Sequence, residues 1–361
     1  MFSIDEYRKE QRLKLGKSIK NRLKIYLDTK YWGYLCDVLL GKNTNIDLME
    51  IYNLLIKLSK EKKIICPLSY RLYSELFKQK DINRFNETTK IMEFLSENIQ
   101  ILFEGELINY EFLYFLYENL KDKEAIYEAD IFVWTKICDV LGAINFEYLP
   151  FLTDKNNEFI QKRYFEDIWK YTFSELVRHK LDNETELILN DSFKNMVTTI
   201  NKEKIEFEHE LKNQHKVYMS EIAGLLEGYK EDIKLTFSHF ATKETKSKEQ
   251  IGNKSDDNIQ PIINLIYNLF DNKKMRTYFP SLDIRAKMFS TIRWNKNQNF
   301  KENDFNDIGH ITSALPYYNY FFTEKSFSTL IKNVEYDKKY SCCVEWEPKV
   351  ILNILKSIND S

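Results

Sequence analysis

Five carboxylates in this 361-residue chain stand where predicted strands end or predicted helices begin: Asp28, Glu75, Asp304, Asp307 and Glu324. Ligand sites in open α/β sheets gather beyond the carboxyl ends of the strands. Carboxylates brought together there repel one another, and a hard divalent cation such as Mg²⁺ or Mn²⁺ offsets that repulsion through oxygen ligands. Such a cation activates water and stabilises the charge of a phosphate during in-line displacement. These residues therefore predict metal-dependent hydrolysis of a phosphodiester.

The elements that must position these acids come from both ends of the chain. The first 80 residues follow the pattern strand, helix, helix, strand, helix, with strands expected at residues 24–27 and 63–67. Near the other end, an acidic helix over 304–315 precedes candidate strands at 317–323 and 341–346 and a final helix from Pro348. We expect an α/β fold with a mostly parallel central sheet flanked by helices, built from strands of both chain ends.

Between these ends the strand signals fade and apolar residues follow helical spacing, as in segments 108–120, 159–181 and 202–226. We assign residues 1–81 and 296–361 to the two parts of the α/β domain and residues 82–295 to a large, all-helical insertion. The polar stretch 241–258 has almost no large apolar side chain, so we expect it to be a mobile loop.

Four segments resemble motifs of PIN-like nuclease domains, in the order in which that family has them. They are IYLDTKYW at 25–32, CPLSYRLYSEL at 66–76, NDFNDIGHITSALPY at 303–317 and NYFFTEKSF at 319–327. The resemblance implies a compact α/β fold with a mostly parallel sheet. It also implies the activity of a metal-dependent ribonuclease with Mg²⁺ or Mn²⁺ as cofactor.

Transferred motif by motif, the resemblance implies four catalytic, metal-binding acids and one accessory metal ligand: Asp28, Glu75, Asp307 and Glu324, with Asp304. Two positions depart from the family pattern. Glu324 stands where the family more often has Asp, and Asn319 stands where relatives can carry a further Asp. An aspartate between a strand and a helix, as Asp28 is, is also a common helix N-cap, which is the ordinary alternative for this residue.

Groups that could bind a nucleic acid lie before and within the acidic helix. Arg285, Arg293 and Lys296 precede it with Trp294 interleaved, and basic side chains beside an aromatic ring suit a single strand. His310, on the acidic helix itself, could position a phosphate or a water, or serve as a structural hydrogen-bonding residue. We expect a nucleic-acid partner, RNA rather than DNA, because the family that the motifs resemble consists mainly of ribonucleases.

Composition excludes several other chemistries. The chain has no G-x-G-x-x-G or G-x-x-x-x-G-K-[ST] loop, no H-E-x-x-H or G-x-S-x-G motif, and no C-x-x-C pair among its five cysteines. The odd cysteine count, without a signal peptide or a long apolar run, predicts a cytoplasmic protein with no membrane partner. The net charge of −2 confines any nucleic-acid surface to a local patch. A second copy of the chain, or a partner protein at the helical insertion, could complete that surface.

The leading hypothesis is therefore an endonuclease that hydrolyses phosphodiester bonds in single-stranded RNA, with a toxin or antiviral defence role open. The alternative is a catalytically inactive, PIN-like nucleic-acid-binding or scaffolding protein, which the departures at Glu324 and Asn319 keep open. Metal-dependent cleavage of RNA discriminates between the two.

Overall fold

The computed structural model describes residues 4–120, 129–140, 149–181, 189–206, 213–245, 259–272 and 278–360. The chain forms two compact units. The first unit comprises Met1–Phe103, Asp130–Leu187 and Ser313–Ser361, and the second comprises Glu104–Ala129 and Ile188–Thr312. Both ends of the described chain therefore belong to the first unit.

The first unit contains all the strands of the described chain. They are β1 (Leu23–Leu27), β2 (Ile64–Ile65), β3 (Ile99–Ile101), β4 (Trp134–Lys136), β5 (Tyr320–Phe322) and β6 (Cys343–Glu345). Its helices are α1 (Ile4–Ile19), α2 (Thr29–Leu39), α3 (Ile46–Lys60), α4 (Tyr70–Leu76), α5 (Ile82–Ser96), α7 (Ala129–Phe132), α8 (Ile137–Val140), α9 (Asp154–Ile168), α10 (Phe173–Leu181), α17 (Lys325–Asn333), α18 (Tyr336–Lys339) and α19 (Pro348–Asp360).

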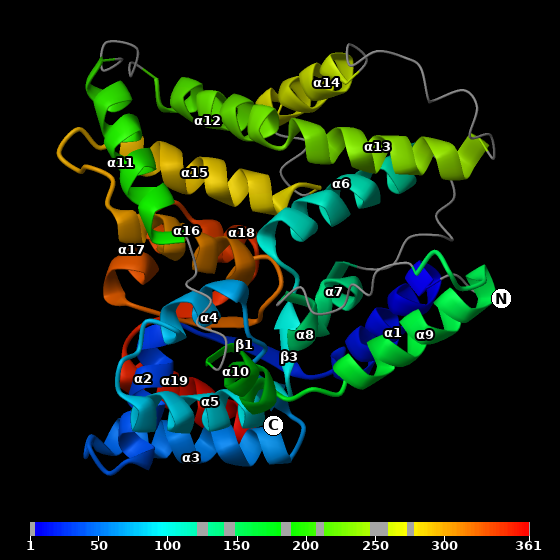
Figure 1. Ribbon diagram of the computed structural model, residues 1–361. Helices are drawn as coiled ribbons and strands as arrows, with labels where there is room; N and C mark the ends of the chain where they lie inside the picture. Colours follow the sequence, from blue (N-terminus) through cyan, green and yellow to red (C-terminus); the bar gives the residue numbers. More distant parts are fainter. Residues whose placement is uncertain are drawn as a thin grey trace. The chain divides into compact units, whose positions relative to one another are not determined.

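A parallel sheet in the order β2-β1-β5-β6 forms the centre of the first unit. Its registers align the strand ends, because Leu27 pairs with Phe322 and Phe322 pairs with Glu345. Four of the five residues of β1 are buried, as expected for a parallel strand covered on both faces. Helix α3 packs against α2 and α19, and α2 packs against α5 (Figure 1). The prediction of an α/β fold with a parallel sheet built from both chain ends is confirmed.

Aromatic packing joins the two central strands. The Tyr26 ring of β1 meets the rings of Tyr318 and Phe321 edge to face, with centroids 5.1 and 5.2 Å apart. Its hydroxyl shares a 2.7 Å hydrogen bond with Ser69 Oγ, so the buried polar end of the ring is satisfied. Burying a large side chain of this kind contributes about 1.5–3 kcal/mol. The aromatic run at 317–323 is therefore largely core of the first unit.

Two short strands correct the prediction of an all-helical insertion. Strand β3 pairs antiparallel with β4 within the segment 82–295, and a bridge between Leu68 and Gln100 connects β3 to the chain after β2. Residues 82–103 and 130–187, which we assigned to the insertion, pack within the first unit.

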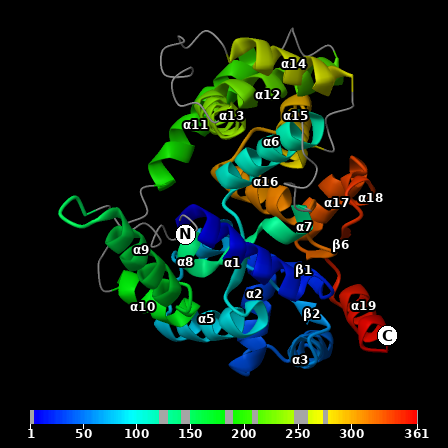
Figure 2. The same cartoon turned by 90° about the vertical axis from the view of Figure 1, so that its right-hand side faces the viewer.

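The second unit is helical throughout its described residues. Its helices are α6 (Glu104–Leu120), α11 (Leu189–Glu206), α12 (Gln214–Gly228), α13 (Lys230–Thr245), α14 (Gln260–Asp271), α15 (Pro280–Trp294) and α16 (Glu302–Ala314), whose last two residues belong to the first unit. Apolar side chains of α6, α12, α13, α14 and α15 form one buried cluster, and Figure 2 shows these helices together. Of the stretch 241–258, residues 241–245 end α13 rather than a loop, and 246–258 lie outside the described residues.

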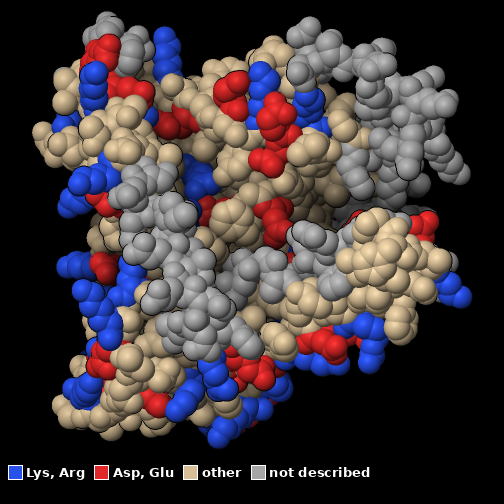
Figure 3. Space-filling model, in the orientation of Figure 1, with Lys and Arg blue, Asp and Glu red and all other residues tan. Residues whose placement is uncertain are grey.

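The surface carries interspersed charges. On the face drawn in Figure 3, Lys and Arg side chains alternate with Asp and Glu side chains over the described residues. This mixture agrees with the net charge of −2 and offers a polyanion only local contact points.

None of the described helices is both long enough and apolar enough to cross a membrane.

Candidate metal centre

Asp28 stands at the carboxyl end of β1, where the chain turns into α2. It is 7% exposed, and its backbone N–H continues the ladder by donating to Phe322 O at 3.0 Å. Asp28 Oδ1 accepts from Thr29 N at 2.6 Å, and Asp28 Oδ2 accepts from Thr323 Oγ1 at 2.7 Å. An ionised carboxylate has about four acceptor positions, so each oxygen retains capacity for a further ligand. The carboxylate is thus held by the first residue of α2 and by the residue that follows β5, and it can still bind a cation.

Hydrogen bonds of Thr29 link Glu75 to Asp28. Glu75 lies on α4, which follows β2, and its Oε2 accepts a short hydrogen bond from Thr29 Oγ1. Thr29 therefore donates its backbone N–H to one carboxylate and its hydroxyl to another. The structure brings together these two predicted acids, which are 47 positions apart in the chain, by way of one hydrogen-bonding residue.

Among the residues that the structure describes, one group of potential ligands is close enough to hold a metal ion: Asp28, Glu75 and His310. Their ligand atoms all lie within 4.8 Å of one another, and Asp28 and His310 are buried. His310 lies on α16, three residues before that helix enters the first unit at Ser313. Two carboxylates and one imidazole form a donor set that suits a divalent transition metal such as Mn²⁺.

The electrostatics of Asp28 also fit a cation. No lysine or arginine of the described residues forms an ion pair with Asp28, although the carboxylate is buried. A buried charge without a counter-ion costs several kcal/mol, which hydrogen bonds offset in part and a bound cation offsets more completely. The donor set and this uncompensated charge together show that the group could hold a metal ion.

The remaining predicted acids are not members of that group. Asp307 is buried on α16 and accepts two hydrogen bonds from Asn303 Nδ2, at 3.1 and 3.0 Å. Asp304 Oδ2 accepts from Lys301 N at 2.8 Å at the start of the same helix, and burial raises the pKa of its carboxyl despite this hydrogen bond. Glu324 is exposed at the N-terminal end of α17, directly after Thr323.

Asn319, the second departure from the family pattern, has a structural contact of its own. Its Oδ1 accepts from Lys24 N at 2.8 Å, and its backbone N–H donates to Lys24 O at 2.9 Å. These bonds align the amino ends of β1 and β5. Asp28 follows the carboxyl end of β1, so Asn319 acts at the opposite end of the strand.

Two of the predicted substrate-binding arginines are engaged within the second unit. Arg285 pairs with the buried Glu104 at 2.5 Å and donates to Tyr229 Oη at 2.6 Å. Arg293 pairs with Glu221 at 2.5 Å, and burial raises the pKa of Glu221 although Arg293 favours its charged form. Lys296 is exposed, as is Trp294 two residues before it. The arginines therefore have structural partners, and neither is a spare cation for phosphate.

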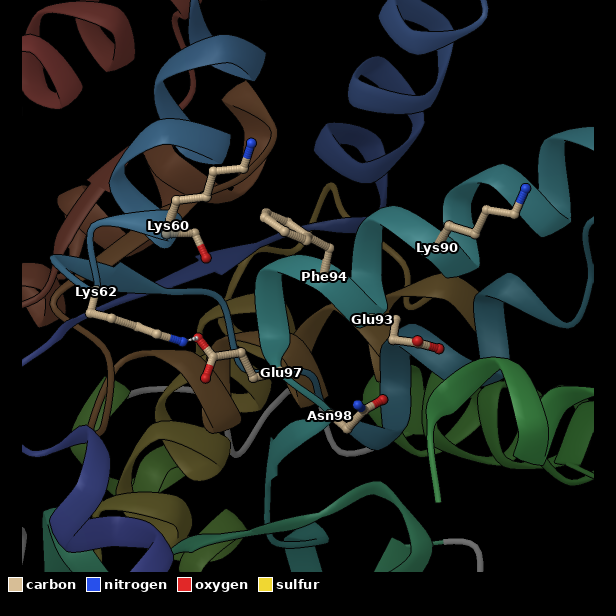
Figure 4. Close-up of a pocket in the computed structure, with 8 residues that line it drawn as sticks. Lys60, Lys62, Lys90, Glu93, Phe94, Glu97 and Asn98 are labelled. Carbon is tan, nitrogen blue, oxygen red and sulfur yellow. Dashed lines mark hydrogen bonds and ion pairs between the residues drawn. The ribbon is translucent and has the colours of Figure 1, made fainter. Parts of the chain in front are cut away.

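A pocket of about 480 Å³ lies at the amino end of β2 instead (Figure 4). Three lysines line it, and Lys62 pairs with Glu97 at 2.8 Å. The C-terminal ends of α3 and α5 meet there, and helix C-termini favour cations. Lys60 lies in the last turn of α3, whereas Lys62 and Lys90 form ion pairs with Glu97 and Glu87. The pocket contains no member of the metal-binding group.

Sequence reasoning missed Thr29 and Thr323, the two residues that orient the acids. A signal was present, because each hydroxyl is adjacent in sequence to a predicted acid, in Asp28-Thr29 and Thr323-Glu324. His310 was expected as a substrate-binding or structural residue, and its place in the group adds metal ligation to these roles.

Comparison with known proteins finds no match: no family model, no curated protein and no solved structure corresponds to this chain. The resemblance to PIN-like nucleases therefore depends on the four sequence motifs alone.

Proposed function

We propose that this chain is a metal-dependent endonuclease of the PIN-like type, which hydrolyses phosphodiester bonds in single-stranded RNA. The observation that carries the proposal is the buried Asp28 carboxylate, hydrogen-bonded on both oxygens, without a cationic partner in the described chain and within ligand distance of Glu75 and His310. Asp28 and Glu75 both belong to sequence motifs that resemble those of PIN-like nucleases.

Asp28, Glu75 and His310 would hold the cation, and a bound divalent cation supplies an activated water and charge neutralisation at the phosphate. The imidazole in the donor set favours Mn²⁺ over Mg²⁺, because Mg²⁺ prefers oxygen ligands throughout. We expect Mn²⁺ to support activity at lower concentration than Mg²⁺.

The chain's own residues supply orientation. Hydrogen bonds from Thr323 and Thr29 restrict Asp28 to one rotamer, and Thr29 also restrains Glu75. Because these acids are already ordered, less conformational entropy is lost when the metal and the substrate bind. Asp307, one turn before His310 on α16, and the exposed Glu324 are the acids that we assign to the substrate side of the site. Both remain part of the proposed catalytic set.

The test is cleavage of end-labelled single-stranded RNA and single-stranded DNA of the same sequence, in Mn²⁺ and in EDTA. Asp37→Asn is the matched control. Asp37 lies on α2, the helix that follows Asp28, but its carboxylate forms an ion pair with Arg84 at 2.9 Å. We expect RNA cleavage with 5′-phosphate products in the wild type and in Asp37→Asn, and loss of at least two orders of magnitude in rate in Asp28→Asn and Asp307→Asn.

Cleavage that persists in EDTA, or full activity in Asp28→Asn, would refute the proposed centre. RNA binding without cleavage in any metal would instead favour the inactive nucleic-acid-binding alternative.

A further inference from the structure

The carboxyl edge of the parallel sheet presents more than the acids. The registers of β1, β5 and β6 end together, so Asp28, Thr323 and Trp346 follow three neighbouring strand ends in one row. Neighbouring strands lie about 4.8 Å apart, which places the Trp346 backbone about 10 Å from that of Asp28. Trp346 is half-buried, so part of this residue is accessible to solvent.

Two lysine–aromatic pairs border this row. The Lys325 ammonium lies over the Trp346 ring at 5.0 Å from the centroid, and the Lys30 ammonium lies over the Tyr34 ring at 5.7 Å. Lys325 begins α17, while Lys30 and Tyr34 are four residues apart on α2, where side chains share a face. Neither lysine forms an ion pair within the described part of the chain, and both are exposed.

Tyr31 connects the two pairs. Its hydroxyl donates to Trp346 O at 2.6 Å, and its ring meets the Tyr34 ring edge to face at 5.7 Å. Tyr31 is 1% exposed, and burial raises the pKa of its hydroxyl far above the ordinary value, so the group remains a donor at any physiological pH. One buried residue thus contacts the Tyr34 ring and the Trp346 backbone at the strand ends.

We propose that Trp346 and Tyr34, with Lys325 and Lys30, form a binding track for single-stranded nucleic acid beside the Asp28 centre. The inference rests on the proposed function and specifies how that site holds its substrate. On binding, a base stacks on each ring and the displaced ammonium turns to a neighbouring phosphate. A duplex does not fit this chemistry, because its base faces are already stacked.

The charge around the track explains why it belongs to the metal centre. Glu324 and Glu347 are exposed beside the lysines, whereas Glu345 is paired with Lys332 at 3.0 Å and accepts from Trp346 N at 2.9 Å. Two lysines beside two exposed carboxylates give little net attraction for a polyanion. Binding of a phosphate chain here therefore requires a divalent cation at the acids in addition to stacking.

The experiment measures the fluorescence anisotropy of a labelled 12-nucleotide RNA titrated with the full chain in Ca²⁺, in place of Mn²⁺, to separate binding from cleavage. Trp346→Leu and Tyr34→Leu alter separate elements, and Phe159→Leu, which removes an exposed aromatic ring of α9, is the matched control. Thermal melts verify that each variant folds. Trp346 uses only its backbone carbonyl toward Tyr31, so the substitution leaves that bond in place.

We expect each track variant to raise the dissociation constant about 5- to 150-fold, as measured for the loss of one base–aromatic stack. Lys30→Gln with Lys325→Gln should reduce the slope of log affinity against log salt by about 1.4, since each phosphate contact on a single strand contributes about 0.7. Phe159→Leu and competition by duplex RNA should have little effect.

Wild-type affinity in both leucine variants, or equal affinity for the duplex, would overturn the track and leave the proposed nuclease intact. Track-dependent binding without cleavage in Mn²⁺ would support the track and refute the nuclease. No binding of any oligonucleotide by the wild type would overturn both.

Discussion

The substitution Asp28→Asn should make the metal-free protein more stable, although it removes the central residue of the proposed site. Ligand atoms of Asp28 and Glu75 lie within 4.8 Å, and two unit charges at about this distance repel by about 3.5 kcal/mol at an effective dielectric constant of about 20. The asparagine removes the repulsion but weakens two hydrogen bonds, from Thr29 N and Thr323 Oγ1, by about 1 kcal/mol each. The Thr323 hydroxyl can rotate to accept from the new amide. We expect a net gain of about 1–2 kcal/mol.

In the presence of Mn²⁺ the wild type should instead be more stable than Asp28→Asn. A ligand present at about 100 times its dissociation constant stabilises the folded state by about 2.7 kcal/mol, which the wild type gains and the Asn variant loses. Differential scanning fluorimetry in EDTA and in a Mn²⁺ series measures both effects, with Asp37→Asn as the control that loses an ion pair to Arg84 and keeps the Mn²⁺ response. A variant that is less stable than the wild type in EDTA and equally stabilised by Mn²⁺ would show that Asp28 is a structural residue.

Five further substitutions, at four positions, test other parts of the structure. Thr323→Val removes the hydroxyl that orients Asp28 and should weaken Mn²⁺ binding about 10- to 100-fold by calorimetry, whereas Thr323→Ser should preserve it. Burial alone would raise the pKa of Glu97, but Arg22 and Lys62 outweigh it and the pKa lies below its usual value. The contribution of the Glu97 carboxylate to stability is therefore present above the ordinary Glu pKa and is lost as the pH falls through the lowered pKa of Glu97. Glu97→Gln should destabilise the protein at pH 7 by about 1–2 kcal/mol. Denaturation measured at a series of acidic pH values should show this difference becoming smaller as the pH falls. Gly16→Ala would place a methyl group 1.8 Å from Ile131 O and should lower the melting temperature by several degrees, whereas Gly224→Ala, with open space around it on α12, should raise stability by about 1 kcal/mol.

Strands that carry the site were predictable because each is an apolar run ended by a polar residue. The run at 24–27 became β1 at Leu23–Leu27, and the runs near 320 and 343 became β5 and β6. Strands β3 and β4 were not predictable, since each has three residues and a polar one at its centre. Gln100 in β3 is fully buried because its side chain bonds Tyr73 Oη at 2.8 Å and Lys136 O at 3.1 Å, contacts that no local pattern announces.

The same limit applies to the basic side chains. Arg285 and Arg293 precede an acidic helix in sequence, which suggested substrate binding, but their partners Glu104 and Glu221 are 181 and 72 positions away. Local composition identifies a charge and does not identify its counter-ion. By contrast, the Lys30–Tyr34 pair is local on one helix and could be found by its i, i+4 spacing alone.

Whether Asp28 is a helix cap or a ligand can be decided from the other helices of the same unit. Helices α3, α5 and α9 are each capped by a side chain that accepts the N–H three residues on: Asn45 from Leu48, Asp81 from Arg84 and Thr153 from Asn156. Asp28 accepts instead from Thr29, the next residue, and its second oxygen is bound by Thr323 of another strand end. The N–H groups of Tyr31 and Trp32 are satisfied by the backbone carbonyl of Asp28, at 2.8 and 3.2 Å. Asp28 is the N-cap residue of α2, but its carboxylate satisfies only the first N–H of the helix, and its second oxygen is bound by the Thr323 hydroxyl at the sheet edge. The usual cap accepts the N–H of the second or third helical residue, so capping accounts for only part of this buried charge, whose cost a bound cation would offset.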